Sequence, residues 1–149
     1  MRLTYLWSPK STVVETAVHT LLGVLYAAWR RPDVLHLHAV GPGLLAPLAR
    51  LLGLRVVLTH HGPDYERSKW GPVSKGLLRI GEQLGVRFSN HPIVVSPMLQ
   101  DRVEKRYGVD ATLIPNGAPA SLPTTSQRCL DKFGLTPERY VLCVSRIDP

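Results

Sequence analysis

The chain has 149 residues, 44% of them hydrophobic and 19% charged, which is the composition of a globular protein and the length of about one domain. This balance excludes an intrinsically disordered chain, and the net charge of +7 indicates an anionic partner. No basic run is interleaved with aromatic residues, so we expect no nucleic-acid partner. The two cysteines have no ligand spacing, and we expect reduced thiols in a cytoplasmic protein.

Short apolar runs alternate with longer helical patterns along the chain. The expected strands, in chain order, are 2–7, 33–38, 55–60, 92–96, 111–115 and 140–145. The expected helices are 12–29, 43–52, 73–88, 97–107 and 126–133. The most apolar stretch, 17–29, is shorter than the ~20 residues of a membrane span and is interpreted as part of a buried helix. The alternation predicts an α/β fold with a Rossmann-like parallel sheet and helices over both faces.

Several residues mark where the expected helices begin or end. Gly53 follows "LARLL" and Gly108 follows "VEKRY", and both positions suit the left-handed residue that ends a helix. Ser96 followed by Pro97 predicts an N-cap and the first helical residue after it.

A change of composition divides the chain near residue 117. After "TLIPNG" (112–117) comes "APASLPTTSQ", a run rich in proline, serine, threonine and alanine that is typical of a linker. A helical pattern and the strand pattern "RYVLCVSR" then follow, and the chain stops at "IDP". We therefore predict one α/β domain at 1–116, and at 117–149 a linker with the first strand of a second, incomplete domain.

Ligands of open parallel sheets bind beyond the carboxyl ends of the strands, where loops and helix N-termini converge. The loops after the expected strands are rich in glycine and in hydrogen-bonding residues. They predict a binding crevice lined by His38, Gly41, Gly43, His60, His61, Ser96 and Asn116.

The histidines are considered first as metal ligands. His36 and His38 lie on one side of a strand, but there is no HExxH motif or supporting cysteine and aspartate cluster, so we predict no metal site. We interpret His36 as a hydrogen-bonded residue of a buried strand. His60 ends its strand, and its sequence position leaves packing and crevice lining both open. His61 precedes a Gly-Pro turn, and its position leaves a functional role and a loop role both open.

The loop "DYERSKW" (64–70) carries charges of both signs. A solvated surface loop is one interpretation, and substrate contact is the other, with the candidates Asp64, Glu66, Arg67 and Lys69. In the following helix, Lys75 and Arg79 lie one turn apart on the same face. That face either contacts an anionic membrane surface or is simply solvated.

The ordered set "DVLHLHAVGPG" (33–43), "VVLTHHGPDYERSKWG" (56–71), "IVVSP" (93–97), "TLIPNG" (112–117) and "VLCVSRIDP" (141–149) resembles the family 4 (group 1) glycosyltransferases of the GT-B fold. The resemblance implies an N-terminal Rossmann-like domain for the acceptor and a C-terminal one for a nucleotide-sugar donor. It also implies sugar transfer without metal or cofactor, with retention of the anomeric configuration.

The resemblance assigns roles to individual residues. His61 matches the histidine of the family's T-x-H-G segment, which lies close to the transferred sugar, and is our candidate catalytic residue. Arg146 matches the arginine of the "GR" segment that holds the donor diphosphate, a group that guanidinium binds bidentately. The other expected substrate-binding residues are His38, Gly41, His60, Asp64, Glu66, Arg67, Lys69, Ser96 and Asn116.

The chain also departs from the family pattern. The family's first strand with its glycine-rich loop, and the E-x7-E segment of the donor domain, have no counterpart, and Ser145 stands where glycine is common. We expect a fragment of a transferase that is inactive alone. The whole enzyme would move a sugar from a nucleotide-sugar to a glycan or lipid-linked acceptor, in the cytoplasm or at the inner face of the membrane. The alternatives are an inactive remnant or binding module of the same fold, and a nucleotide-sugar epimerase.

Overall fold

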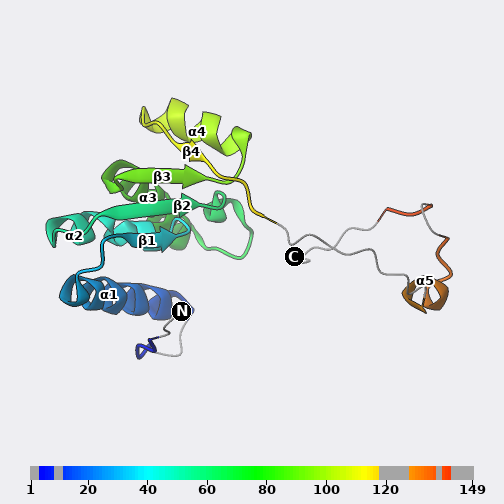
Figure 1. Cartoon of the computed structure of the whole chain (residues 1–149), viewed down its shortest axis with the longest axis horizontal. Coiled ribbons are helices and arrows are strands. Elements are labelled where there is room, and N and C mark those ends of the chain that lie inside the picture. Colours follow the sequence, from blue (N-terminus) through cyan, green and yellow to red (C-terminus); the bar gives the residue numbers. More distant parts are fainter. Residues whose placement is uncertain (1–3, 9–11, 118–127, 137–138, 142–149) are drawn as a thin grey trace. The chain divides into compact units, whose positions relative to one another are not determined.

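The computed structural model of the chain describes residues 4–8, 12–117, 128–136 and 139–141 (Figure 1). The chain divides into two compact units, Met1–Asn116 and Gly117–Pro149. The first unit contains a parallel sheet and the helices α1 to α4. The described part of the second unit contains the short helix α5 (Arg128–Lys132), within the helix predicted at 126–133.

The sheet consists of the strands β1 (Leu35–His38), β2 (Val56–His60), β3 (His91–Val94) and β4 (Thr112–Leu113). They lie in the order β1-β2-β3-β4 and all pairs are parallel. These strands correspond to the predictions at 33–38, 55–60, 92–96 and 111–115. The predicted α/β fold with a Rossmann-like parallel sheet and flanking helices is therefore confirmed.

The long helices follow the predicted ranges closely. They are α1 (Thr12–Arg30), α3 (Pro72–Phe88) and α4 (Pro97–Tyr107). The helix predicted at 43–52 is divided into a 3-10 turn, η1 (Pro42–Leu45), and α2 (Ala46–Leu51). A second 3-10 turn, η2 (Asp64–Glu66), lies in the charged loop that was predicted without regular structure.

The helix boundaries have the residues that the sequence analysis assigned to them. Gly53 and Gly108 adopt positive φ angles of 80° and 65°, the left-handed conformation that glycine adopts without steric cost. The Ser96 hydroxyl accepts a hydrogen bond from the Leu99 amide, and Pro97 is the first residue of α4. These short-range signals therefore predict where α4 begins and where α2 and α4 end.

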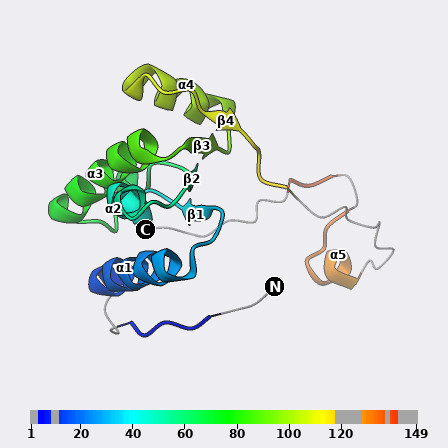
Figure 2. The same cartoon turned by 60° about the vertical axis from the view of Figure 1, so that its left-hand side comes forward.

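The core lies between the helices and one face of the sheet. Because the strands are consecutive in space, each crossover helix returns over the same face, and Figure 2 shows α1 to α4 on one side of the sheet. Helices were expected over both faces, whereas within residues 12–117 none covers the opposite face, which exposes His36 and His38. The largest fully buried apolar residues are Leu58, Val24, Val40, Val56, Val86, Val94 and Val103. Each contributes about 1.5–3 kcal/mol by leaving water.

The predicted first and last strands are not formed by the described residues. Residues 4–8 have no regular structure, so the strand predicted at 2–7 is wrong over that part, and its remainder lies outside the described residues. An apolar run becomes a strand only when a neighbour satisfies its backbone groups, and no described strand pairs with the free edge of β1. Of the strand predicted at 140–145, residues 140–141 are not extended into a sheet and 142–145 lie outside the described part.

Glycines allow α3 to approach the η1 turn closely. A Cβ atom added at Gly43 would lie 2.5 Å from the Gly81 carbonyl oxygen, and one at Gly81 would collide with the Val40 carbonyl oxygen. A Cβ at Gly85 would lie 2.9 Å from Gly43 Cα. Backbone therefore packs on backbone here, and this contact places the start of η1, just after β1, beside α3.

Candidate functional site

The carboxyl ends of β1 and β2 bring two exposed histidines into direct contact. His38 is the last residue of β1, and His61 follows the last residue of β2. The His38 Nδ1 and His61 Nε2 atoms are 3.2 Å apart, and the two rings stack with centroids 5.5 Å apart. One of the two nitrogens must donate, so each imidazole constrains the tautomer of the other. Two residues predicted for the crevice thus lie together at its expected place.

His36 extends this group along the exposed face of β1. Its ring lies 4.1 Å from that of His38, centroid to centroid, and its Nε2 is 2.7 Å from the Thr59 hydroxyl oxygen. Desolvation, and then the positive charge that His38 and His61 can acquire, lower the pKa of His36 from its ordinary value of 6.5. The predicted hydrogen bond is present, but the predicted burial is wrong because no described helix covers this face.

The histidine group is not arranged as a metal site. Among the described residues, no set of three His, Cys, Asp or Glu side chains has a geometry that could hold a metal ion. Two imidazoles joined directly by a hydrogen bond have turned those nitrogens toward each other instead of toward a shared cation.

His60 is buried beneath this exposed group. Its side chain is 0% exposed, and its Nε2 lies 2.8 Å from Glu82 Oε1 of α3, which is also fully buried. The Gly62 amide donates a 3.1 Å hydrogen bond to His60 Nδ1, so that nitrogen carries no proton and Nε2–H donates to Glu82. Of the two roles left open by the sequence, the structure places His60 in packing, where it cannot line the crevice surface.

Tyr65 and Tyr107 complete the surroundings of the buried carboxylate. Their hydroxyl groups donate to Glu82 Oε2 at 2.9 Å and 2.8 Å. The guanidinium of Arg106 lies 3.6 Å from the same oxygen and also donates to the Tyr65 hydroxyl. Arg102 donates to the Tyr65 hydroxyl and to Glu66, both at 2.8 Å. This buried network ties the charged loop to α3 and α4.

Hydrogen bonding decides the charge of Glu82. Burial by itself raises the pKa of this carboxyl, but the hydrogen bonds from His60, Tyr107 and Tyr65 outweigh burial and lower the pKa from 4.5 to about 2. The same contacts act on the donors, since burial and the neighbouring Glu82 raise the pKa values of Tyr65 and Tyr107. At neutral pH Glu82 is therefore a carboxylate, and the two tyrosines that donate to it are neutral.

The lowered pKa of Glu82 predicts how stability depends on pH. The unfolded chain binds a proton at this carboxyl near pH 4.5, and the folded chain only near about 2. The stabilisation is therefore complete above the unfolded pKa and is lost as the pH falls toward about 2, amounting to about 3 kcal/mol. Urea unfolding across this window should show a smaller loss in Glu82→Gln than in the parent chain. Parallel curves for the two proteins would contradict the lowered pKa.

An apolar cavity of about 250 Å³ opens beside the turn that follows β1. Its walls come from α1, from η1 and from the start of α3, and they include Leu44, Leu77 and Leu78. Two predicted substrate-binding residues, Gly41 and Asp64, line it. Ala39, also in the wall, has a φ of 71°, an unusual conformation for a residue with a side chain and one that turns the chain from β1 into η1.

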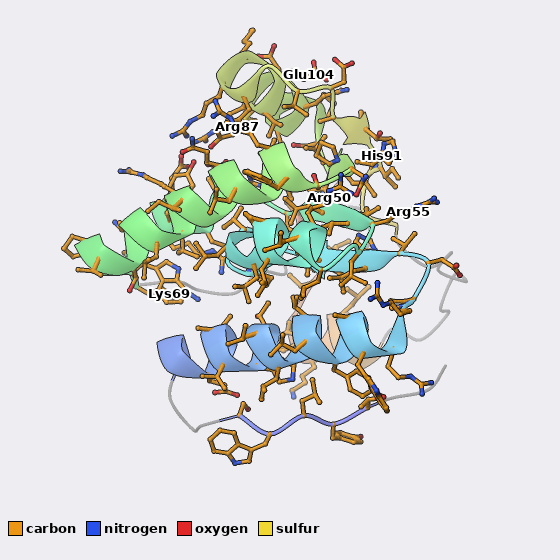
Figure 3. All side chains as sticks on the ribbon, turned by 90° about the vertical axis from the view of Figure 1, so that its left-hand side faces the viewer. Arg50, Arg55, Lys69, Arg87, His91 and Glu104 are labelled. Carbon is orange, nitrogen blue, oxygen red and sulfur yellow. The ribbon has the colours of Figure 1, made fainter. Side chains whose placement is uncertain are left out.

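The remaining predicted residues of the charged loop do not line this cavity. Arg67 is half-exposed and its Nε lies 3.5 Å from Asp64 Oδ1. Glu66 is held by Arg102. The Lys69 ammonium lies 4.9 Å from the centroid of the Trp70 ring, which lines the cavity. Figure 3 shows Lys69 on the opposite side of the domain from the basic group of Arg50, Arg55 and His91.

The last predicted residues are farther from the histidine group. Ser96 follows β3 and its hydroxyl is used as the N-cap of α4. Asn116 follows β4 and is exposed, at the boundary between the two units. Both stand at carboxyl ends of strands, as predicted, but one and two strands beyond β2. Arg146 lies outside the described residues, and so does its predicted diphosphate contact.

Sequence reasoning missed the buried network around Glu82. One signal was available, because Leu78, Glu82 and Val86 recur at four-residue spacing and so place Glu82 between two apolar residues on one face of α3. A carboxylate on such a face needs partners. The tyrosines and arginines that supply them come from η2 and α4, and no local pattern relates those segments to α3.

The comparisons with known proteins agree with the sequence resemblance. No curated protein matches the chain. None of the described helices combines the length and the apolar character that crossing a bilayer requires. The family described as Glycosyltransferase Family 4 matches residues 6–122. Because that match spans far more than half of the 149 residues, and the sheet and histidine group lie within it, the chain belongs to glycosyltransferase family 4.

Proposed function

We propose that this chain contributes the acceptor side of a sugar-transfer site, in which a sugar passes from a nucleotide-sugar to a glycan or lipid-linked acceptor. The observation that carries the proposal is the exposed His61 at the carboxyl edge of the sheet, in contact with His38, whose chain neighbour Ala39 lines an apolar cavity. An exposed imidazole beside a concave wall can hydrogen-bond a sugar hydroxyl while the wall holds the acceptor.

The proposed chemistry uses neither a metal nor a cofactor. Departure of the nucleoside diphosphate builds negative charge, which fixed cations stabilise, and we assign that role to Arg146 of the second unit. His61 hydrogen-bonds the transferred sugar as positive character develops at its anomeric carbon, in a reaction that retains the anomeric configuration. The domain assignment, with acceptor binding in 1–116 and the start of a donor-binding domain in 117–149, belongs to the same proposal.

The cavity and its rim supply the acceptor contacts in this proposal. Asp64 at the rim can accept a hydrogen bond from an acceptor hydroxyl, and the leucine walls suit an apolar group attached to it. On the outer surface of α3, the side chains of Val73, Leu77 and Ile80 are 77%, 44% and 48% exposed. With cations on the same helix, this surface supports a peripheral contact with the inner face of the cytoplasmic membrane.

One observation favours a second candidate function, a binding module without catalysis. The cavity is lined wholly by residues between Thr16 and Leu78 of the first unit, so an acceptor can be held there without the second unit. Addition of a UDP- or GDP-sugar separates the two functions. A transferase is stabilised by its donor and its melting temperature rises, whereas a module for the acceptor alone is unaffected.

Replacement of His61 tests the transfer itself. In a protein that joins this chain to a complete donor-binding domain, we expect His61→Ala to lower the rate of nucleoside diphosphate release from a nucleotide-sugar in the presence of acceptor by roughly a hundredfold. His91→Ala is the matched control, because His91 is also an exposed histidine but stands at the amino end of β3. Transfer by His61→Ala at the parent rate would remove His61 from the mechanism. Absence of transfer in that protein without the substitution, with acceptor binding retained, would favour the binding module.

A further inference from the structure

The loop that carries His61 rests on a buried carboxylate to which the proposed chemistry assigns no role. Glu82 is fully buried in α3 and accepts three hydrogen bonds from side chains. Two of the donors, His60 and Tyr65, stand on either side of His61 in the sequence, and the third, Tyr107, belongs to α4. One anionic group thus anchors both ends of the segment 60–65.

The anchor at the first end acts on the peptide that follows His61. Glu82 accepts from His60 Nε2–H, which leaves His60 Nδ1 free to accept the Gly62 amide at 3.1 Å. Gly62 has a φ of 144°, a backbone conformation that side chains rarely allow. His61 is therefore held between a ring fixed by Glu82 on its amino side and an amide fixed by that same ring on its carboxyl side.

The anchor at the second end fixes the η2 turn. Tyr65 is 3% exposed and its hydroxyl donates to Glu82 while accepting from Arg102 and Arg106 of α4. Arg102 also binds Glu66, the next residue of the turn. Because both ends are held, the backbone around His61 is restrained, and the His61 side chain contacts His38.

We propose that Glu82 is a positioning residue, which acts through His60 and Tyr65 to hold the 60–65 segment in the conformation that presents His61 at the edge of the sheet. The catalytic meaning of this positioning rests on the proposed function of His61. The conformational role of Glu82 does not depend on that function, since it concerns segment 60–65 in the free chain. A preorganised imidazole is worth more to a reaction than a mobile one, because no ordering remains to be done at the moment of transfer.

The two tyrosines provide a pair of variants for comparison, in which Tyr65→Phe also removes the contacts with Arg102 and Arg106. Tyr65→Phe and Tyr107→Phe each remove one hydroxyl that donates to the same Glu82 oxygen at nearly equal distance, but only Tyr65 belongs to the segment. We expect amide exchange of Gly62 to become roughly tenfold faster in Tyr65→Phe and to stay within about twofold of the parent in Tyr107→Phe. We also expect the nitrogen shifts of His61 and His38 to change in Tyr65→Phe and in Glu82→Gln, as their shared hydrogen bond is lost.

Equal Gly62 exchange and equal His61 shifts in the two phenylalanine variants would overturn the positioning role, because loss of global stability alone would act on both. If either tyrosine variant does not fold, the comparison is made instead between Arg102→Leu and its control Lys105→Leu. Arg102 binds Glu66 of the η2 turn, whereas Lys105 pairs only with surface Asp101 among the described residues. Neither measurement needs a substrate. Failure of the His61→Ala transfer test would therefore remove the proposed function and leave the positioning role of Glu82 intact. Failure of the exchange and chemical shift measurements would remove the positioning role and leave the proposed function intact.

Discussion

Replacement of Glu82 by leucine should lower the free energy of unfolding by about 3–5 kcal/mol, the largest effect we expect from a single change in this chain. The leucine side chain fills the space but accepts no hydrogen bond. It leaves the His60 Nε2–H and the Tyr65 hydroxyl without their acceptor in buried positions, and the Tyr107 hydroxyl without its acceptor in a partly buried one. Each buried donor left unpaired carries a desolvation penalty that the folded state cannot recover.

The control for this change is the next residue of α3. Gln83 is exposed, so Gln83→Leu alters the same helix and introduces the same side chain without touching the network. We expect Gln83→Leu to stay within about 0.5 kcal/mol of the parent in urea unfolding. A Glu82→Leu chain as stable as Gln83→Leu would mean that the carboxylate is not the centre of the loop's support. A Glu82→Leu chain that is unfolded in buffer would agree with the prediction.

Replacement of Gly81 by alanine should destabilise the chain by about 1–3 kcal/mol, although alanine is the better helix former. The added methyl group would collide with the Val40 carbonyl oxygen, which belongs to the backbone and cannot rotate away as a side chain could. The clash can be relieved only if α3 moves away from η1. That movement would disturb the turn after β1 and the cavity beside it.

Gly76 supplies the opposite result on the same helix. A Cβ added at Gly76 meets nothing within 4 Å, and the residue lies inside α3. Gly76→Ala should therefore gain helix propensity and raise the free energy of unfolding by about 1 kcal/mol. Thermal unfolding of Gly81→Ala and Gly76→Ala is compared, because helix propensity changes equally in both. The difference between their stabilities therefore measures the cost of the steric clash at Gly81. A stabilised Gly81→Ala chain would show that α3 does not need its close approach to η1.

Local chemistry made much of the fold predictable from the sequence. The spacing of apolar residues and the positions of turn and capping residues predicted β1 to β4 and the long helices. Both signals act within a few residues of the chain. The strand predicted at 2–7 was wrong over residues 4–7 because extended structure requires a partner strand, which composition cannot guarantee. The expectation of helices on both faces of the sheet was wrong because it depended on the spatial order of the strands. That order cannot be predicted from the residues of any single segment.

The candidate site was predicted in part. The rule that ligands gather at the carboxyl ends of parallel strands led to His38 and His61, which the structure brings to within 3.2 Å of each other. The same rule could not distinguish His60 from His61. Adjacent residues at a strand end point to opposite sides, and which side is buried depends on where α3 packs.

The class of the fold and the residues near the carboxyl ends of the strands could be read from the sequence, because these follow from periodicity and from backbone preferences. Which of the two adjacent histidines is exposed could be seen only in the folded chain. The reason is that a buried carboxylate on α3 binds His60 and Tyr65, and the partners of a buried charge come from segments far apart in the chain.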